Sequence, residues 1–117
     1  MKERRRQRSA RKDEALRLLL EAVRSRSDVS SVALVDGRGL VVEGAGPERE
    51  LFVLGAVAAP AAAGTFDAAC ERLTAGTDVV SCRLSLGERT LYLAALGDRV
   101  TRMPEAARGV ARILRAS

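Results

Sequence analysis

The sequence predicts one α/β domain of the α+β class, in which helices cover both faces of a mostly antiparallel, five-stranded sheet. Three stretches predict this fold: a turn between two β-rich runs at residues 32–43, an apolar helical stretch at 47–73, and an alternating run at 78–86 followed by a second strand at 90–96. The first two runs lack clean alternation of apolar and polar residues, so both sheet faces should be covered. We therefore expect a three-layer α/β/α sandwich with the order α-β-β-α-β-β-β-α.

The net charge of +5 is distributed unevenly along the 117 residues. Residues 1–12 hold seven Lys or Arg and one Glu, which gives +6, whereas the other 105 residues hold thirteen basic and fourteen acidic side chains, which gives −1. A chain of this length is expected to form one domain. We place that domain at residues 13–117 and treat residues 1–12 as a basic arm.

The basic arm is predicted to be a flexible, solvated extension. The alternative is an electrostatic tether to an anionic partner, either nucleic acid, an anionic membrane or an acidic protein patch, because clustered Lys and Arg gain by releasing counterions. Residue 2 is Lys, so the myristoylation pattern is absent and a membrane role would depend on charge alone. The residues of this arm are Lys2, Arg4, Arg5, Arg6, Arg8, Arg11 and Lys12.

The composition argues against most kinds of enzyme. The chain has no histidine, which is the commonest general base and metal ligand. Cys70 and Cys82 do not form a CxxC pair, and reduced thiols in a cytoplasmic protein are the expectation. Gly44–Gly46 lacks the third glycine of a dinucleotide fingerprint, and no P-loop motif occurs. We expect no catalytic, cofactor or metal site, no small-molecule substrate and no membrane-spanning segment.

A helix is predicted from about Ser9 to Arg26, because Leu16, Leu19, Leu20 and Val23 recur at helical spacing. Two short strands follow at 32–35 and 40–43. The turn between them, Asp36-Gly37-Arg38-Gly39, contains two glycines that supply the positive φ values of a tight hairpin.

Residues 47–73 read as one long helix, with Pro47 at its first position and two glutamates in its first turn. The middle of this helix carries almost no charge on any side, although a helix on the surface of a monomer should show a polar face. We infer that a partner covers the second side, most simply a second copy of the chain. The alternative, a helix buried within a monomer, is disfavoured by the short chain. Pro60 should kink the helix, so the span could also be two shorter helices.

The expected dimer contact combines small and aliphatic residues of this helix with two residues of the following strand. They are Leu51, Leu54, Gly55, Ala58, Ala61, Ala62, Val80 and Cys82. Leu54→Arg is expected to place an unpaired charge in this contact.

The last third of the chain predicts a meander and a helix. Strands at 78–86 and 90–96 are expected to pair as an antiparallel hairpin, with a turn at Gly97-Asp98 after them and a weak fifth strand at Arg99–Met103. Pro104 opens the final helix, whose arginines 108, 112 and 115 lie opposite its apolar face.

This order of elements, with VALVDGRGLVVEG before an alanine-rich helix and a late Gly-Asp turn, resembles the roadblock/dynein light chain (LAMTOR/MglB-like) family over about residues 13–116. The resemblance implies a profilin-like fold and a homodimer formed through the long helix and the strand Asp78–Leu86. It also implies a non-catalytic platform that binds and regulates a small Ras-like GTPase by acting on the GTPase's switch segments. Pro60, the polar fifth strand and the basic arm depart from the family pattern.

Overall fold

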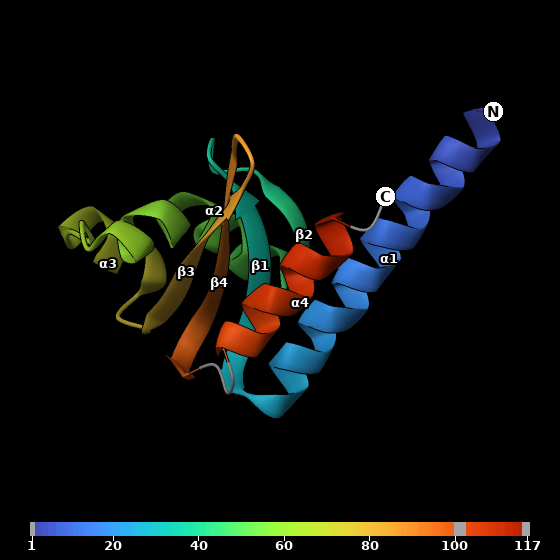
Figure 1. Cartoon of the computed structure of the whole chain (residues 1–117). Coiled ribbons are helices and arrows are strands. Elements are labelled where there is room, and N and C mark those ends of the chain that lie inside the picture. The colour runs from blue at the N-terminus through green and yellow to red at the C-terminus, as the bar shows by residue number, and fades with distance from the viewer. Residues whose placement is uncertain (1, 100–102, 116–117) are drawn as a thin grey trace.

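The computed structural model describes residues 2–99 and 103–115, with the side chains of residues 2–10, 98 and 99 outside the described part. Figure 1 shows a central sheet with helices on both faces and a first helix that projects beyond the body of the molecule. The elements are, in chain order, α1 (Lys2–Arg26), β1 (Asp28–Asp36), β2 (Val41–Ala45), α2 (Glu48–Ala63), α3 (Ala68–Thr74), β3 (Val79–Leu86), β4 (Arg89–Arg99) and α4 (Met103–Arg115).

The sheet has four strands in the order β2-β1-β4-β3, and each neighbouring pair is antiparallel. The predicted fifth strand is wrong for the described residues: Arg99 ends β4 and Met103 begins α4, while residues 100–102 lie outside the described part. The predicted turn at Gly97-Asp98 is also wrong, because β4 continues through it. Gly97 has φ +147, and a Cβ there would lie 2.7 Å from the Cα of Val29, so glycine permits an irregular pairing with β1.

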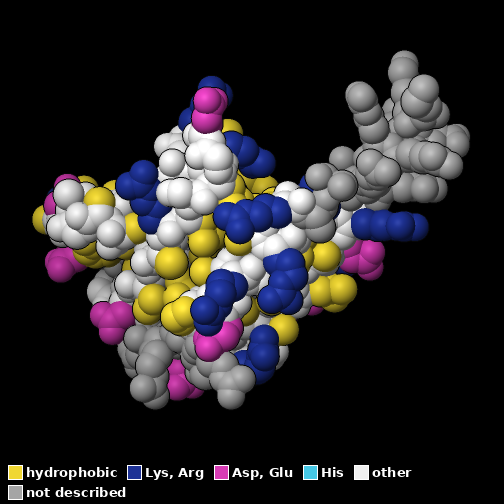
Figure 2. Space-filling model, viewed as in Figure 1, with side chains coloured by type: hydrophobic (Ala, Val, Ile, Leu, Met, Phe, Trp, Pro, Cys, Tyr) yellow, Lys and Arg dark blue, Asp and Glu magenta, His cyan; other side chains and the backbone are white. Residues whose placement is uncertain are grey.

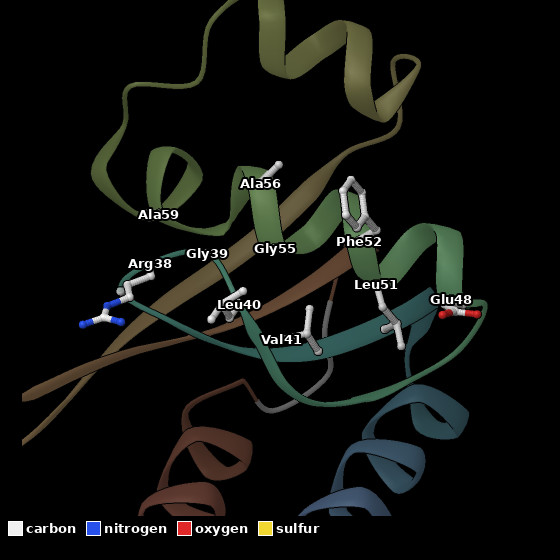
Figure 3. A pocket seen from close by; sticks show the side chains of 11 residues that line it. Arg38, Gly39, Leu40, Val41, Glu48, Leu51, Phe52, Gly55, Ala56 and Ala59 are labelled. Atoms are coloured by element: carbon white, nitrogen blue, oxygen red, sulfur yellow. The ribbon is translucent and has the colours of Figure 1, made fainter.

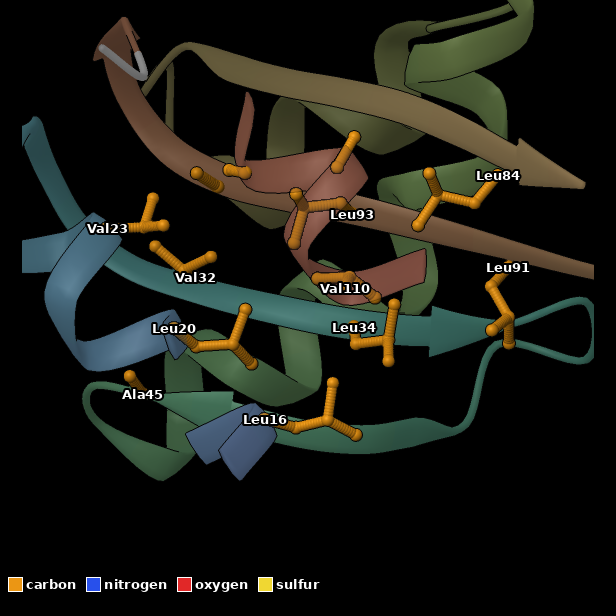
Figure 4. Close-up of a cluster of buried hydrophobic side chains, with 13 residues drawn as sticks. Leu16, Leu20, Val23, Val32, Leu34, Ala45, Leu84, Leu91, Leu93 and Val110 are labelled. Atoms are coloured by element: carbon orange, nitrogen blue, oxygen red, sulfur yellow. The ribbon is translucent and has the colours of Figure 1, made fainter. Parts of the chain in front are cut away.

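The predicted three-layer arrangement is confirmed. On one face of the sheet, α1 and α4 cover a buried cluster that includes Leu16, Leu20, Val32, Leu34 and Val110 (Figure 4). On the other face, α2 covers a second cluster: Ala33, Val35, Leu54, Ala58, Ala94 and Leu96. Successive residues of β1 therefore enter opposite cores, which explains why the strand is apolar without alternation.

The first helix is longer than predicted. It begins at Lys2 instead of about Ser9 and runs without a break to Arg26, so the backbone of the basic arm continues α1. The side-chain amine of Lys12 donates a hydrogen bond to the backbone oxygen of Leu114 over 3.4 Å, which places the end of α4 beside α1. The division into a flexible arm and a domain at residue 13 stays a prediction.

The expected single helix at 47–73 is wrong, and the alternative of two shorter helices is confirmed. The break follows Gly64, not Pro60. Gly64 adopts the left-handed conformation at φ +73 and ends α2, and the N–H of Thr65 bonds to the Pro60 oxygen at 2.9 Å. The Asp67 carboxylate then caps α3 by accepting from the Cys70 N–H at 3.0 Å. Proline removes one hydrogen bond, whereas the αL glycine and the new cap redirect the chain.

Candidate functional site

The outer face of α2, defined by Phe52, Ala56, Ala59 and Ala63, is apolar, and the described residues leave it largely uncovered, with only Ala59 half-buried. No charged residue occurs from Leu51 to Ala63. The Phe52 side chain is 80% exposed, and Ala56 and Ala63 are exposed as well. Burying a phenylalanine side chain contributes about 1.5–3 kcal/mol. This face is therefore a strong candidate for contact with another protein surface.

A groove of about 610 Å³ lies between α2 and the hairpin that joins β1 to β2 (Figure 3). Leu40 and Val41 of the hairpin are 62% and 36% exposed, so the groove opens onto apolar side chains. Arg38 and Glu48 stand at its opposite ends (Figure 3). The lining residues are Gly37, Arg38, Gly39, Leu40, Val41, Glu48, Leu51, Phe52, Gly55, Ala56 and Ala59.

Two glycines set the distance between the hairpin and α2. A Cβ on Gly55 would lie 2.6 Å from the Gly39 backbone oxygen, and a Cβ on Gly39 would lie 3.0 Å from the Gly55 oxygen. Gly39 also has φ +86, a conformation that side-chain-bearing residues rarely adopt. The groove exists in this shape because both backbones lack side chains at their point of contact.

Gly55→Ala is expected to destabilise the fold by about 1–3 kcal/mol, because the new methyl would push against backbone atoms that cannot rotate away. Helix propensity alone predicts the opposite sign, with a gain of up to about 1 kcal/mol. Gly109→Ala in α4 is the matched control, since its Cβ would meet only a Leu19 methyl at 3.1 Å. Urea unfolding measures both. Equal stabilisation of the two variants would show that the hairpin and α2 are not in tight contact.

The hairpin turn is held by the Asp36 carboxylate. It accepts hydrogen bonds from the N–H groups of Arg38 at 2.8 Å and Leu40 at 3.0 Å. The Asp36 N–H donates to the Leu40 oxygen at 2.9 Å, which closes the turn. The hydrogen bonds from Leu40 and Arg38 favour the charged form and hold the pKa of Asp36 below its ordinary value of 3.8. The sequence prediction of a tight turn is confirmed, but the expectation that both glycines adopt positive φ is wrong, because Gly39 does and Gly37 does not.

A folded-state pKa below the unfolded value means that Asp36 stabilises the turn above pH 3.8 and loses this effect as pH falls through the lower value. NMR titration of the Arg38 and Leu40 amide shifts should therefore show a midpoint below pH 3.8. Asp36→Asn should remove that titration. A midpoint at or above 3.8 in the unmodified chain would contradict the hydrogen-bonded turn.

Beside α2 lies the β3 edge, defined as the side of Val79–Leu86 that faces away from β4. Within the described residues β3 pairs with β4 alone, so this edge has no strand partner. The Ser81 hydroxyl donates to the Ala58 oxygen at 2.8 Å and connects β3 to α2. An unpaired edge offers backbone donors and acceptors to another strand.

The predicted dimer residues occupy three environments. Leu54, Gly55 and Ala58 are buried on the inner side of α2, under cover of their own chain. Leu51, Ala61 and Ala62 are half-buried. Val80 and Cys82 are half-buried and pack against the core under α1 and α4, on the sheet face opposite α2. Contact of these residues with a second copy stays a prediction.

Sequence reasoning missed Phe52 and the hairpin residues Leu40 and Val41 as site residues. The most regular apolar stripe of the helix faces the sheet, so it marks the core instead of the exposed site. A large aromatic side chain off that stripe was the available signal, because Phe52 falls between the core positions Leu51 and Leu54.

The described residues contain no group of three His, Cys, Asp or Glu side chains placed to hold a metal ion. Both cysteines are free thiols, with Cys70 buried and Cys82 half-buried. No helix in the described part of the chain is long and apolar enough to cross a bilayer.

Two solved structures resemble the chain along most of its length. The gliding protein MglB from Thermus thermophilus matches with a TM-score of 0.59 and 18% sequence identity, over 91% of this chain and 93% of that one. MglB from Myxococcus xanthus matches with a TM-score of 0.57 and 15% identity, over 88% and 90%. No protein-family model and no curated protein sequence matches. The chain therefore has the fold of these MglB structures, which confirms the roadblock/MglB-like fold expected from the sequence.

Proposed function

We propose that the chain is a non-catalytic, homodimeric module that binds and regulates a small Ras-like GTPase. The observation that carries this proposal is the uncovered apolar surface made by the outer face of α2 and the adjoining groove. Phe52 at 80% exposure and Leu40 at 62% exposure lie on this surface. The MglB-like fold and the family resemblance stated above support the choice of partner.

The dimer would use two features that lie side by side. The outer face of α2 provides small side chains, which let a second helix approach closely, and the β3 edge provides unpaired backbone groups. In a two-fold dimer each surface meets its own copy, so both must be self-complementary. The uncharged helix face meets that condition without a like-charge contact, and the strand edge meets it through its backbone groups, with Arg83 as the charged side chain of β3.

The GTPase would contact the hairpin side of the groove, because Phe52, Ala56 and Ala59 on its α2 side also belong to the proposed dimer face. The apolar Leu40 and Val41 beside the charged Arg38 favour a partner segment that has apolar side chains next to an acidic residue. The chain has no P-loop, so it would act on the nucleotide site of the GTPase through that protein's switch segments. We place this activity in the cytoplasm, in keeping with two free thiols.

The test uses the small Ras-like GTPase encoded closest to this chain, loaded with GDP or with a non-hydrolysable GTP analogue. We expect micromolar or tighter binding to one nucleotide state, and a change in GTP hydrolysis or nucleotide release when the chain is added. Leu40→Glu should abolish binding, because it puts a charge into the apolar groove. Leu18→Glu, on the exposed side of α1, is the control and should bind normally. Equal binding by both variants, or no binding in either nucleotide state, would refute the GTPase proposal.

A further inference from the structure

The C-terminal end of α4 and the base of the basic arm lie together in space. Lys12 of α1 donates a hydrogen bond to the Leu114 oxygen, although the two residues are 102 positions apart. Figure 1 shows α4 lying beside α1, and the first turns of α1 continue beyond the end of α4. The C-terminal end of α4 is therefore next to Lys12, the last residue of the basic arm.

Three arginines of α4, at positions 108, 112 and 115, are exposed and follow one stripe of the helix. Arg108 is 3.7 Å from the Glu105 carboxylate, while Arg112 and Arg115 form no ion pair with the side chains that the structure describes. In Figure 2, Lys and Arg side chains gather over α4 and the adjacent part of α1. We call this stripe, together with the basic arm, the cationic track. Asp13 and Glu14 of α1 are the acidic residues that follow the arm directly.

The helical form of the arm concentrates like charges. Seven of the eleven residues from Lys2 to Lys12 are basic and one, Glu3, is acidic, so the helix carries closely spaced positive charges along its sequence. The same basic residues also lie at the positive end of the helix dipole. A row of anions beside the helix would neutralise both effects, so the arm is best suited to a partner with closely spaced negative charges.

We propose that the cationic track binds the phosphate backbone of duplex DNA without base specificity. Ala10 is the only apolar residue from Lys2 to Lys12, so the arm lacks the apolar face with which a helix enters a membrane surface. A helix about 10–12 Å in diameter fits the roughly 12 Å wide major groove of B-form DNA, whereas the major groove of A-form RNA is too narrow. Arginine, which provides five of the seven basic residues, binds phosphate in a bidentate manner. This surface is separate from α2, so the inference does not depend on the proposed GTPase function.

The experiment measures fluorescence anisotropy of a labelled duplex DNA with the full chain at several salt concentrations. Neutralisation of six phosphates should weaken binding about 1,000-fold between roughly 50 and 200 mM salt. Replacing Lys2, Arg4, Arg5, Arg6 and Arg8 together by glutamine should weaken binding at least about 100-fold. The pair Arg112→Gln and Arg115→Gln should weaken it about tenfold and lower the salt slope by about 2. The control pair Arg72→Gln and Arg89→Gln removes the same charge from α3 and from the start of β4, and should change little.

Three further results would overturn the proposal. An α4 variant that binds like the unmodified chain would show that the arm acts without the arginines of α4. Equal losses in the α4 and control pairs would show a general charge effect. Tighter binding to duplex RNA, or to vesicles containing phosphatidylserine, than to DNA at the same salt would assign the arm to another partner. Circular dichroism of each variant confirms that the fold is retained.

Discussion

Leu54→Arg is expected to unfold the chain instead of separating two copies. Leu54 is fully buried and packs among Val35, Ala58 and Leu96 beneath α2. An arginine there has no partner for its charge, and burying an unpaired ion costs several kcal/mol. Domains of this size are stable by only about 5–15 kcal/mol, so the loss removes most or all of the free energy of unfolding.

Circular dichroism and a thermal melt measure this effect. Leu54→Met is the control, since it conserves volume and should cost less than about 1.5 kcal/mol. A folded Leu54→Arg chain that fails to self-associate would contradict the assignment of Leu54 to the core. It would instead support the prediction made from the sequence, in which Leu54 belongs to the dimer contact.

Phe52→Arg is expected to leave each chain folded and to weaken the proposed dimer strongly. The side chain is 80% exposed in the single chain, so its removal should change the free energy of unfolding of a protomer by about 0.5 kcal/mol or less. In the dimer the same position would place two like charges into the centre of an apolar contact. Aromatic residues at such centres contribute about 2 kcal/mol or more, which corresponds to a dissociation constant at least about 30 times larger.

Sedimentation equilibrium at several concentrations gives the dissociation constant of this variant. Leu18→Arg is the matched control, because Leu18 is 54% exposed on α1, on the other side of the sheet. Equal weakening by both substitutions would indicate a non-specific effect of added charge. A Phe52→Arg chain that associates as tightly as the unmodified one would place the contact elsewhere.

The parts of the fold that depend on local chemistry were predictable from the sequence. The turn at Asp36–Gly39 follows from a carboxylate and two glycines within four residues, and its hydrogen bonds are local. The three layers follow from β1, whose run Val32–Val35 is apolar at every position and must be buried on both faces. These inferences need no knowledge of distant contacts.

Features that depend on contacts between distant residues could not be predicted. Every stripe of α2 is apolar, so the pattern alone could not decide that Leu54 faces the sheet and Phe52 faces outward. Gly64 ends α2 through an αL cap, whereas Pro60 was the more conspicuous helix breaker in the sequence. The sequence indicated the turn role of Gly39, but not its contact with Gly55.

The candidate groove was missed for the same reason. Its floor requires the close approach of Gly39 and Gly55, two residues whose backbones meet only in the folded chain. Its walls come from the hairpin and from α2, which are separate elements in the sequence. The cationic track likewise joins Lys12 to the end of α4, a contact that spans most of the chain.

Two chains are proposed to cover the outer face of α2 together, and the effect expected for Phe52→Arg depends on that arrangement. Sedimentation velocity of the unmodified chain at micromolar concentration tests it most directly. A single species of about 25 kDa, twice the 12.5 kDa of one chain, is the predicted result. A species of 12.5 kDa at the same concentration would contradict it.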